Sequence, residues 1–138
     1  MMGTTENKAV STRFIEEVFN KGHYDRINDL LAENFVAYFG GSEQGRAAFT
    51  EMVRAYRNGF PDYHCVIDDQ IAEADQVVTR WTFRGTQSGH LMGIPPTGKE
   101  VTVTGVAVDR IDGGKLVESW LEMDAQRMLQ DLGVVPRS

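Results

Sequence analysis

The feature that most constrains the fold of this chain is the order of its two hydrophobic periodicities. Apolar residues recur at helical spacing in the first half, most clearly at Phe49, Met52, Val53 and Tyr56. The second half instead contains runs rich in valine, threonine and aromatic residues, which are typical of strands. Helices first and strands afterwards predict an α+β fold, with helices covering one face of a curved, mostly antiparallel sheet.

Helical spacing occurs in three parts of the first half. The first predicted helix carries its apolar stripe from Val10 to Phe19 and ends before Gly22. A short second helix is predicted at residues 27–31, followed by a short strand at residues 35–39. The third helix is predicted to end at Asn58-Gly59, because glycine commonly follows the last helical turn.

The second half is predicted to form strands at residues 63–71, 76–84, 101–111 and 116–123. A loop rich in glycine and proline, residues 85–98, separates the second of these strands from the third. Asp112-Gly113-Gly114 predicts a tight hairpin turn between the last two strands. A final short helix is predicted at residues 128–132 and closes at Gly133.

Length, charge and composition exclude several classes of protein. The 138 residues suit one domain, 1–138, and the absence of alternating strands and helices or a glycine-rich phosphate loop argues against nucleotide-binding folds. The 14 basic residues are scattered and the net charge is −6, so nucleic acid is not expected as a partner. No apolar run approaches the length that spans a membrane, and the polar N-terminus has no signal-peptide pattern. We therefore expect a cytoplasmic protein without membrane partners.

Several short motifs, in their order along the chain, carry a resemblance to a known family. They are Phe60-Pro61-Asp62, Gly85-Thr86-Gln87-Ser88-Gly89, Gly93-Ile94-Pro95-Pro96-Thr97-Gly98-Lys99, Gly114-Lys115-Leu116-Val117-Glu118-Ser119-Trp120, Asp124, and Leu129-Gln130-Asp131-Leu132-Gly133. Together they resemble the SnoaL-like polyketide cyclases, also called predicted ester cyclases, of the nuclear transport factor 2-like superfamily. The resemblance covers residues 7–133.

This resemblance implies a cone-shaped fold whose sheet and N-terminal helices enclose an apolar pocket for a small apolar organic ligand. The characterised cyclases of the family close a ring by an intramolecular aldol condensation and need neither a cofactor nor a metal. An acidic residue that serves them as acid/base matches Asp124, whereas a histidine that assists in some members falls on Ala107. The resemblance also implies a homodimer formed sheet to sheet, which covers the open face of such a sheet.

The residues around Asp124 leave two interpretations open. A carboxylate in an apolar cavity can remove a proton next to a carbonyl group and later return one to the new alkoxide. However, Asp124 also lies directly before the last predicted helix, where aspartate is a favoured N-cap. A capping carboxylate accepts backbone N–H groups, which favour its ionised form and make it a poor base.

Strand parity groups the residues near Asp124 into two faces. In a regular strand Glu118, Trp120, Glu122 and Asp124 lie on one face, while Val117, Ser119, Leu121 and Met123 lie on the other. The second set is typical of a packed face. The first set either lines the mouth of a cavity or faces solvent.

The remaining candidates for the pocket are aromatic, titratable or flexible side chains. They are Tyr38, Trp81, His90, Met92, Trp120 and Glu122. The tryptophans either stack on a flat ligand or pack in the core, and Tyr38 and Tyr56 are candidate donors to a ligand carbonyl, although Tyr56 belongs to a core stripe. His90 and Met92 lie in the long loop, over the expected entrance, and Glu122 is either a second carboxylate in the site or a solvated charge.

Three functions remain open from the sequence. The first is a cofactor-free cyclase acting on a small apolar carbonyl compound, the second is a binding protein without chemistry, and the third is a related hydrolase or oxygenase. Resemblance to limonene epoxide hydrolases would require an Arg-x-Asp element where the chain reads Arg80-Trp81-Thr82, which lacks the carboxylate, and ketosteroid isomerases would require an aspartate near Tyr38. The three histidines share no spacing typical of a metal site.

Overall fold

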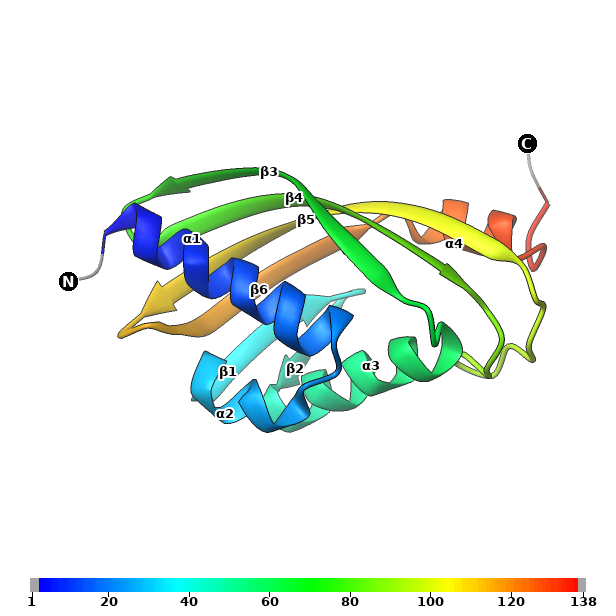
Figure 1. Cartoon of the computed structure of the whole chain (residues 1–138), viewed down its shortest axis with the longest axis horizontal. Helices are drawn as coiled ribbons and strands as arrows, with labels where there is room; N and C mark the ends of the chain where they lie inside the picture. Colours follow the sequence, from blue (N-terminus) through cyan, green and yellow to red (C-terminus); the bar gives the residue numbers. More distant parts are fainter. Residues whose placement is uncertain (1–2, 137–138) are drawn as a thin grey trace.

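One six-stranded sheet organises the chain in the computed structural model, which describes residues 3–136. The strand order is β2-β1-β6-β5-β4-β3, and all neighbours are antiparallel except the parallel pair of β1 and β6. The strands are β1 Leu31–Phe39, β2 Ser42–Gly45, β3 His64–Glu73, β4 Gln76–Thr86, β5 Glu100–Asp112 and β6 Lys115–Met123. The long strands curve together (Figure 1), so the prediction of a curved, mostly antiparallel sheet is confirmed.

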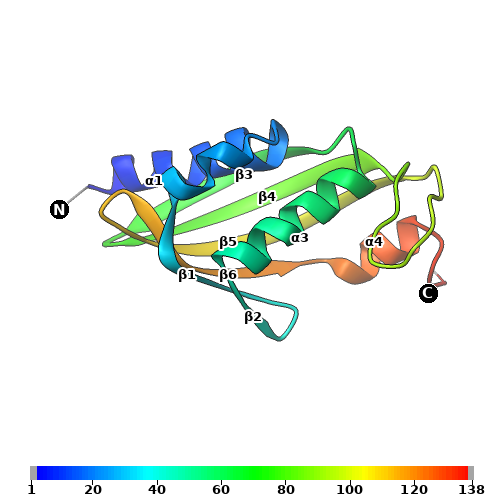
Figure 2. The ribbon, with the colours of Figure 1, turned by 90° about the horizontal axis from the view of Figure 1, so that it is seen from below.

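The helices are α1 Thr4–Arg13, α2 Ile27–Leu30, α3 Arg46–Gly59 and α4 Ala125–Asp131, with the π-helical turn η1 Phe14–Asn20 and the 3-10 turn η2 Tyr24–Arg26. α1 and α3 lie over the same face of the sheet, and α4 follows the end of β6 (Figure 2). None of the helices in the described residues is long and apolar enough to cross a membrane.

The clearest difference from the predicted elements is the hairpin of β1 and β2. β1 already begins at Leu31, and β2 contains only the polar sequence Ser42 to Gly45, which has no hydrophobic period to reveal it. Gly40 and Gly41 form the turn with φ values of 60° and 79°, which glycine adopts without strain. By contrast, the predicted hairpin turn between β5 and β6 is confirmed.

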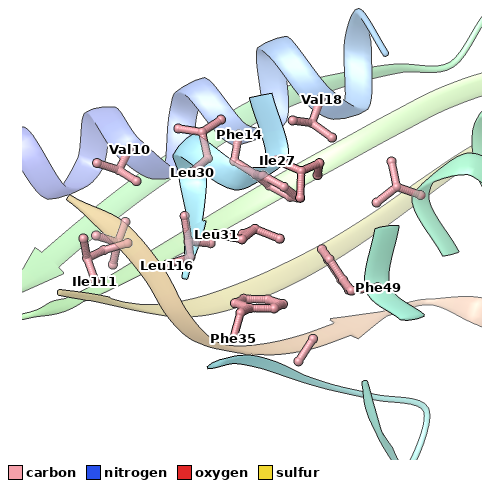
Figure 3. Packing of buried hydrophobic residues seen from close by; sticks show 13 residues of the cluster. Val10, Phe14, Val18, Ile27, Leu30, Leu31, Phe35, Phe49, Ile111 and Leu116 are labelled. Carbon is pink, nitrogen blue, oxygen red and sulfur yellow. The ribbon is translucent and has the colours of Figure 1, made fainter. Parts of the chain in front are cut away.

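The buried apolar residues form two clusters on the helix-covered face. The first, which we call the packed cluster, lies beneath α1 and α2. It contains Val10, Phe14, Val18, Ile27, Leu30, Leu31, Phe35, Ala37, Phe49, Val53, Val77, Ile111 and Leu116 (Figure 3). The Phe49 ring lies 5.8 Å from that of Phe14 and 5.3 Å from that of Phe35, measured between centroids, and these contacts join α3 to η1 and β1.

The second cluster, the cavity cluster, lies toward the other end of the sheet. Its buried residues are Tyr56, Phe60, Tyr63, Cys65, Trp81, Phe83, Leu91, Val101, Val103, Ala107, Met128 and Leu132. η1 serves both clusters: Phe14 and Val18 belong to the packed cluster, whereas Ile15 packs against the cavity cluster. The wide turn of the π-helix therefore directs side chains of one short segment into two cores.

A buried polar contact fixes α1 on the sheet. The Ser11 hydroxyl donates to Asp109 Oδ2 at 2.8 Å, and the Ser119 hydroxyl donates to Asp109 Oδ1 at 2.7 Å. Burial raises the pKa of Asp109 above its ordinary value, while the two hydroxyl donors oppose that change. Since Ser11 lies on α1, this network sets the position of the helix over β5 and β6.

Candidate functional site

A largely apolar cavity lies between η1, α3 and the sheet. Its volume is about 50 Å³. Its lining residues are Ile15, Phe19, Phe39, Met52, Tyr56, Tyr63, Cys65, Trp81, Phe83, Leu121 and Met123. Concave sites of this kind, with few polar groups among apolar walls, are typical of small-molecule binding.

Stacked aromatic rings form one wall of the cavity. The ring of Tyr63 lies 5.7 Å from that of Phe19 and 4.7 Å from that of Phe83, with interplanar angles of 25° and 23°. Trp81 continues the stack, 6.2 Å from Phe83 at 25°. Together the four rings form an aromatic wall that suits an apolar ligand.

The position of the Trp81 ring in this wall depends on Gly105 of β5. The two residues are paired across β4 and β5, and a Cβ at Gly105 would lie 2.2 Å from a ring carbon of Trp81. Such a distance is far inside van der Waals contact, so the indole covers the backbone of β5 only because this position has no side chain. The glycine therefore shapes the cavity wall without lining the cavity itself.

The polar groups of the lining are the indole N–H of Trp81, two phenols and one thiol, all neutral near neutral pH. Burial raises the pKa of Tyr56 to about 12 and that of Cys65 to about 12. Burial also raises the pKa of Tyr63 well above its ordinary value, and a hydrogen bond with the Cys65 thiol raises it further. No Asp, Glu, Lys, Arg or His is among the lining residues of this cavity.

Asp124 lies at the end of β6, outside this lining. Its Oδ1 accepts the backbone N–H of Arg127 at 3.1 Å, so it is the N-cap of α4, and its side chain is exposed. The preceding residue, Met123, does line the cavity. The structure thus shows the capping role of Asp124 directly and places its carboxylate one residue beyond the lining.

A model of the SnoaL-like polyketide cyclase family matches residues 9–132. The chain belongs to this family. Its fold is accordingly nuclear transport factor 2-like, as the similarity to solved structures also shows. No curated protein matches the sequence at a significant level.

Solved structures similar to this SnoaL-like chain cover nearly all of it. AclR, a candidate hydroxylase from Streptomyces galilaeus, has a TM-score of 0.89 and 27% identity over 99% of this chain and 86% of that chain. IdmH, a candidate polyketide cyclase from Streptomyces antibioticus, has a TM-score of 0.82 and 28% identity over 92% of this chain and 98% of that chain. A candidate SnoaL-like polyketide cyclase from Jannaschia sp. CCS1 has a TM-score of 0.87 at 23% identity, over 96% and 95%, which shows the fold alone.

The outward face of the sheet in this SnoaL-like chain carries three of the predicted pocket residues. Tyr38 and Trp120 stack on each other with centroids 5.4 Å apart and an interplanar angle of 15°. Trp120 and Glu122 are both exposed, and they alternate along β6 with the lining residues Leu121 and Met123. Tyr38, Trp120 and Glu122 therefore lie outside the lining, and parity indicates the opposite face of the sheet, whereas Trp81 is a lining residue.

His90 and Met92 lie in the loop between β4 and β5, and neither lines the cavity. Both side chains are exposed, while Leu91 between them is fully buried. The amide of Gln87 holds this loop: it donates to the carbonyl oxygens of Gly89, Ile94 and Pro95 and accepts from the N–H and hydroxyl of Thr97. A fully buried Gln87 with these bonds makes the loop an ordered cap over the cavity cluster.

Several lining residues were absent from the sequence-based site. Tyr63 and Cys65 stand at the start of a predicted strand, and Phe83 shares the parity of Trp81 on β4. Alternation along β4 would have indicated Phe83 once Trp81 was chosen. Nothing in the sequence indicates the π-helical turn that brings Ile15 and Phe19 to the cavity.

The described residues contain no group of three or more His, Cys, Asp or Glu side chains arranged to hold a metal ion. The lining residues of the cavity offer apolar contact, aromatic stacking, and hydrogen bonding from neutral phenol, thiol and indole groups.

Proposed function

We propose that this chain binds a small, neutral and mostly apolar carbonyl compound in the cavity. The observation that supports it best is the lining, whose polar groups belong to Tyr56, Tyr63, Cys65 and the indole of Trp81 and are all neutral. A charged ligand group would lose its hydration here without gaining a partner of opposite charge. An apolar ligand instead gains about 25 cal/mol for each Å² of apolar surface removed from water.

The family supports a reaction for the bound compound: cofactor-free ring closure of a polyketide-like carbonyl substrate by an intramolecular aldol step. A carboxylate removes a proton from the carbon next to one carbonyl, the resulting enolate attacks a second carbonyl of the same molecule, and the new alkoxide takes a proton. We propose Asp124 as this acid/base, because it directly follows the lining residue Met123. To act as a base, the Asp124 carboxylate must give up its hydrogen bond with the Arg127 N–H and contact the substrate instead.

Binding without chemistry is the second candidate function. It is favoured by the exposed position of Asp124 and by its bond to the N–H of Arg127, both of which keep the carboxylate in the state of a helix cap. The similarity to AclR, a candidate hydroxylase, adds an oxygenase or hydrolase as a further alternative for the same cavity.

The replacements Asp124→Asn and Asp124→Ala separate these functions. Asparagine is as good an N-cap as aspartate but has no proton-accepting carboxylate, whereas alanine lacks both properties. Ring closure of a neutral polyketone ester, followed by chromatography, is expected with the wild type and lost in both variants, while ligand affinity is retained in Asp124→Asn. Wild-type turnover by Asp124→Asn would refute the acid/base role, and ligand binding without turnover in the wild type would establish the binding function.

We also propose a cytoplasmic homodimer that associates through the outward sheet face. Trp120, Val106 and Val66 are exposed to 38%, 39% and 41%, and a second sheet would cover such a surface. The free thiol of buried Cys65 suits a reducing compartment. Analytical ultracentrifugation of the wild type and of Trp120→Glu tests the dimer, which the variant is expected to dissociate; a monomeric wild type would refute it.

A further inference from the structure

Tyr56 combines two properties that rarely occur together in a folded protein: it is deeply buried, and its hydroxyl makes no hydrogen bond within the described residues. Its exposed fraction is 5%, and it contributes to the cavity lining from the third turn of α3. Burial alone raises its pKa, without any contribution from a hydrogen-bonded neighbour. A buried hydroxyl that lacks a partner is unfavourable by about 1–3 kcal/mol, so such a group needs an explanation.

The Tyr56 oxygen borders the cavity. Among the described residues, the side-chain oxygen and nitrogen atoms that are fully enclosed and make no hydrogen bond are Glu17 Oε2 and Gln44 Oε1. The Tyr56 hydroxyl is not one of them although it has no partner, so its oxygen adjoins open space. Because Tyr56 lines the cavity and is otherwise buried, that open space is the interior of the cavity.

Tyr63 provides the internal comparison. It lines the same cavity and is equally buried, at 7% exposure, but the neighbouring Cys65 thiol adds to the rise in the pKa of its hydroxyl, a contribution that Tyr56 lacks. Tyr63 is also held on both ring faces by Phe19 and Phe83, whereas Tyr56 meets Phe83 only edge to face, at 6.2 Å and 81°. Of these two phenols, Tyr56 is thus the one whose donor remains available to a ligand.

We infer that the Tyr56 hydroxyl donates a hydrogen bond to the carbonyl oxygen of the bound ligand and thereby selects ligands that place an acceptor deep within the cavity. This inference rests on the proposed binding of a small apolar carbonyl compound. A hydrocarbon of the same shape would leave the phenol unpaired, so discrimination comes from the buried donor itself. If an enolate develops on that oxygen, the same bond becomes charge-assisted and strengthens.

Two probes of nearly equal shape test this assignment: 1-tetralone, a bicyclic ketone, and tetralin, which lacks only the carbonyl oxygen. Affinities for both are measured by calorimetry with the wild type, Tyr56→Phe and the matched control Tyr63→Phe. Tyr56→Phe is expected to weaken tetralone binding by about fivefold and leave tetralin binding unchanged, since a neutral hydrogen bond contributes about 1 kcal/mol net. Tyr63→Phe is expected to affect both probes equally.

The infrared carbonyl stretch of bound tetralone gives a second readout that a merely structural role would not change. Hydrogen bonding lowers this frequency, so we expect a lowered value in the wild type and in Tyr63→Phe, and loss of the shift in Tyr56→Phe. Equal weakening of both probes by Tyr56→Phe, with the shift retained, would overturn the role of Tyr56 while leaving ligand binding intact. Failure of the wild type to bind either probe would instead overturn the proposed function and this inference together.

Discussion

The packed cluster and the cavity cluster use the same kinds of residue but organise them differently. In the packed cluster, phenylalanines from η1, α3 and β1 meet at mixed angles and fill the space between the layers. In the cavity cluster, Phe19 of η1, Tyr63 directly before β3, and Phe83 and Trp81 of β4 form a row of nearly parallel rings that lines the cavity. Rings that pack at mixed angles fill the core between the layers, whereas nearly parallel rings in a row can line a cavity.

The comparison teaches that the tightly packed core and the cavity occupy different ends of one helix-covered face. α2 and β1 both contribute buried residues to the packed cluster, and the Asp109 network fixes α1 above it. These features stabilise the fold at one end of the sheet. The rest of the helix-covered face can therefore contain a cavity, although the residues around a cavity lose dispersion contacts. Replacements in the two clusters should therefore differ in their effect on stability.

The largest expected effect comes from a matched pair on α3. Phe49→Ala removes a ring from the centre of the packed cluster and is expected to lower the free energy of unfolding by about 3–5 kcal/mol. Met52→Ala, one turn further along, removes a half-buried side chain that already borders the cavity, and we expect less than half that loss. Urea titration of both variants measures the difference; equal losses would remove the distinction between the clusters.

The second prediction concerns the Asp109 network. Asp109→Ala leaves two buried serine hydroxyls without an acceptor and is expected to lower the free energy of unfolding by about 2–3 kcal/mol, whereas Asp109→Asn retains an acceptor and should lose less.

The Asp109 carboxyl also predicts that the free energy of unfolding depends on pH. Because its folded-state pKa is raised, the folded state binds its proton more tightly than the unfolded chain does. Its stabilising contribution is complete below the unfolded pKa, ordinarily 3.8, and is lost as pH rises through the folded value. Denaturation across this range should show that Asp109→Asn lacks the decline seen in the wild type; parallel curves would contradict the assignment.

The third prediction sharpens the description of the cavity wall. Gly105→Ala places a methyl group against the Trp81 indole and is expected to lower the free energy of unfolding by about 1–3 kcal/mol. The double variant Gly105→Ala/Trp81→Leu should recover part of this loss, because the smaller side chain vacates the space. Additive losses in the double-mutant cycle would show that the glycine acts through another contact.

The smallest effect is expected at the helix that closes the cavity cluster. Asp124→Ala removes the N-cap of α4 and should lower the free energy of unfolding by about 1 kcal/mol, while Asp124→Asn should leave it nearly unchanged. Thermal melting of both variants measures this. An equal loss in the two variants would indicate that the charge of the carboxylate, rather than its capping bond, stabilises α4.

The sequence alone was sufficient for the fold and for the family. The stripe of Phe49, Met52, Val53 and Tyr56 predicts α3, and the β-branched runs predict β3 to β6, because these segments bury one face with a regular period. The polar strand β2 was missed, since it is specified by pairing with β1 rather than by burial. Motif order correctly indicated the SnoaL-like family.

Only the tertiary structure decided which residues make the site. Periodicity tells which residues share a face, but it does not tell which of the two faces encloses the cavity; this depends on where the helices lie. Trp120 and Trp81 are both strand tryptophans, yet one is 38% exposed on the outward face and the other lines the cavity. Likewise, the spacing of α3 predicts that Tyr56 is buried, whereas its neighbours in space decide that its hydroxyl meets open volume instead of a partner.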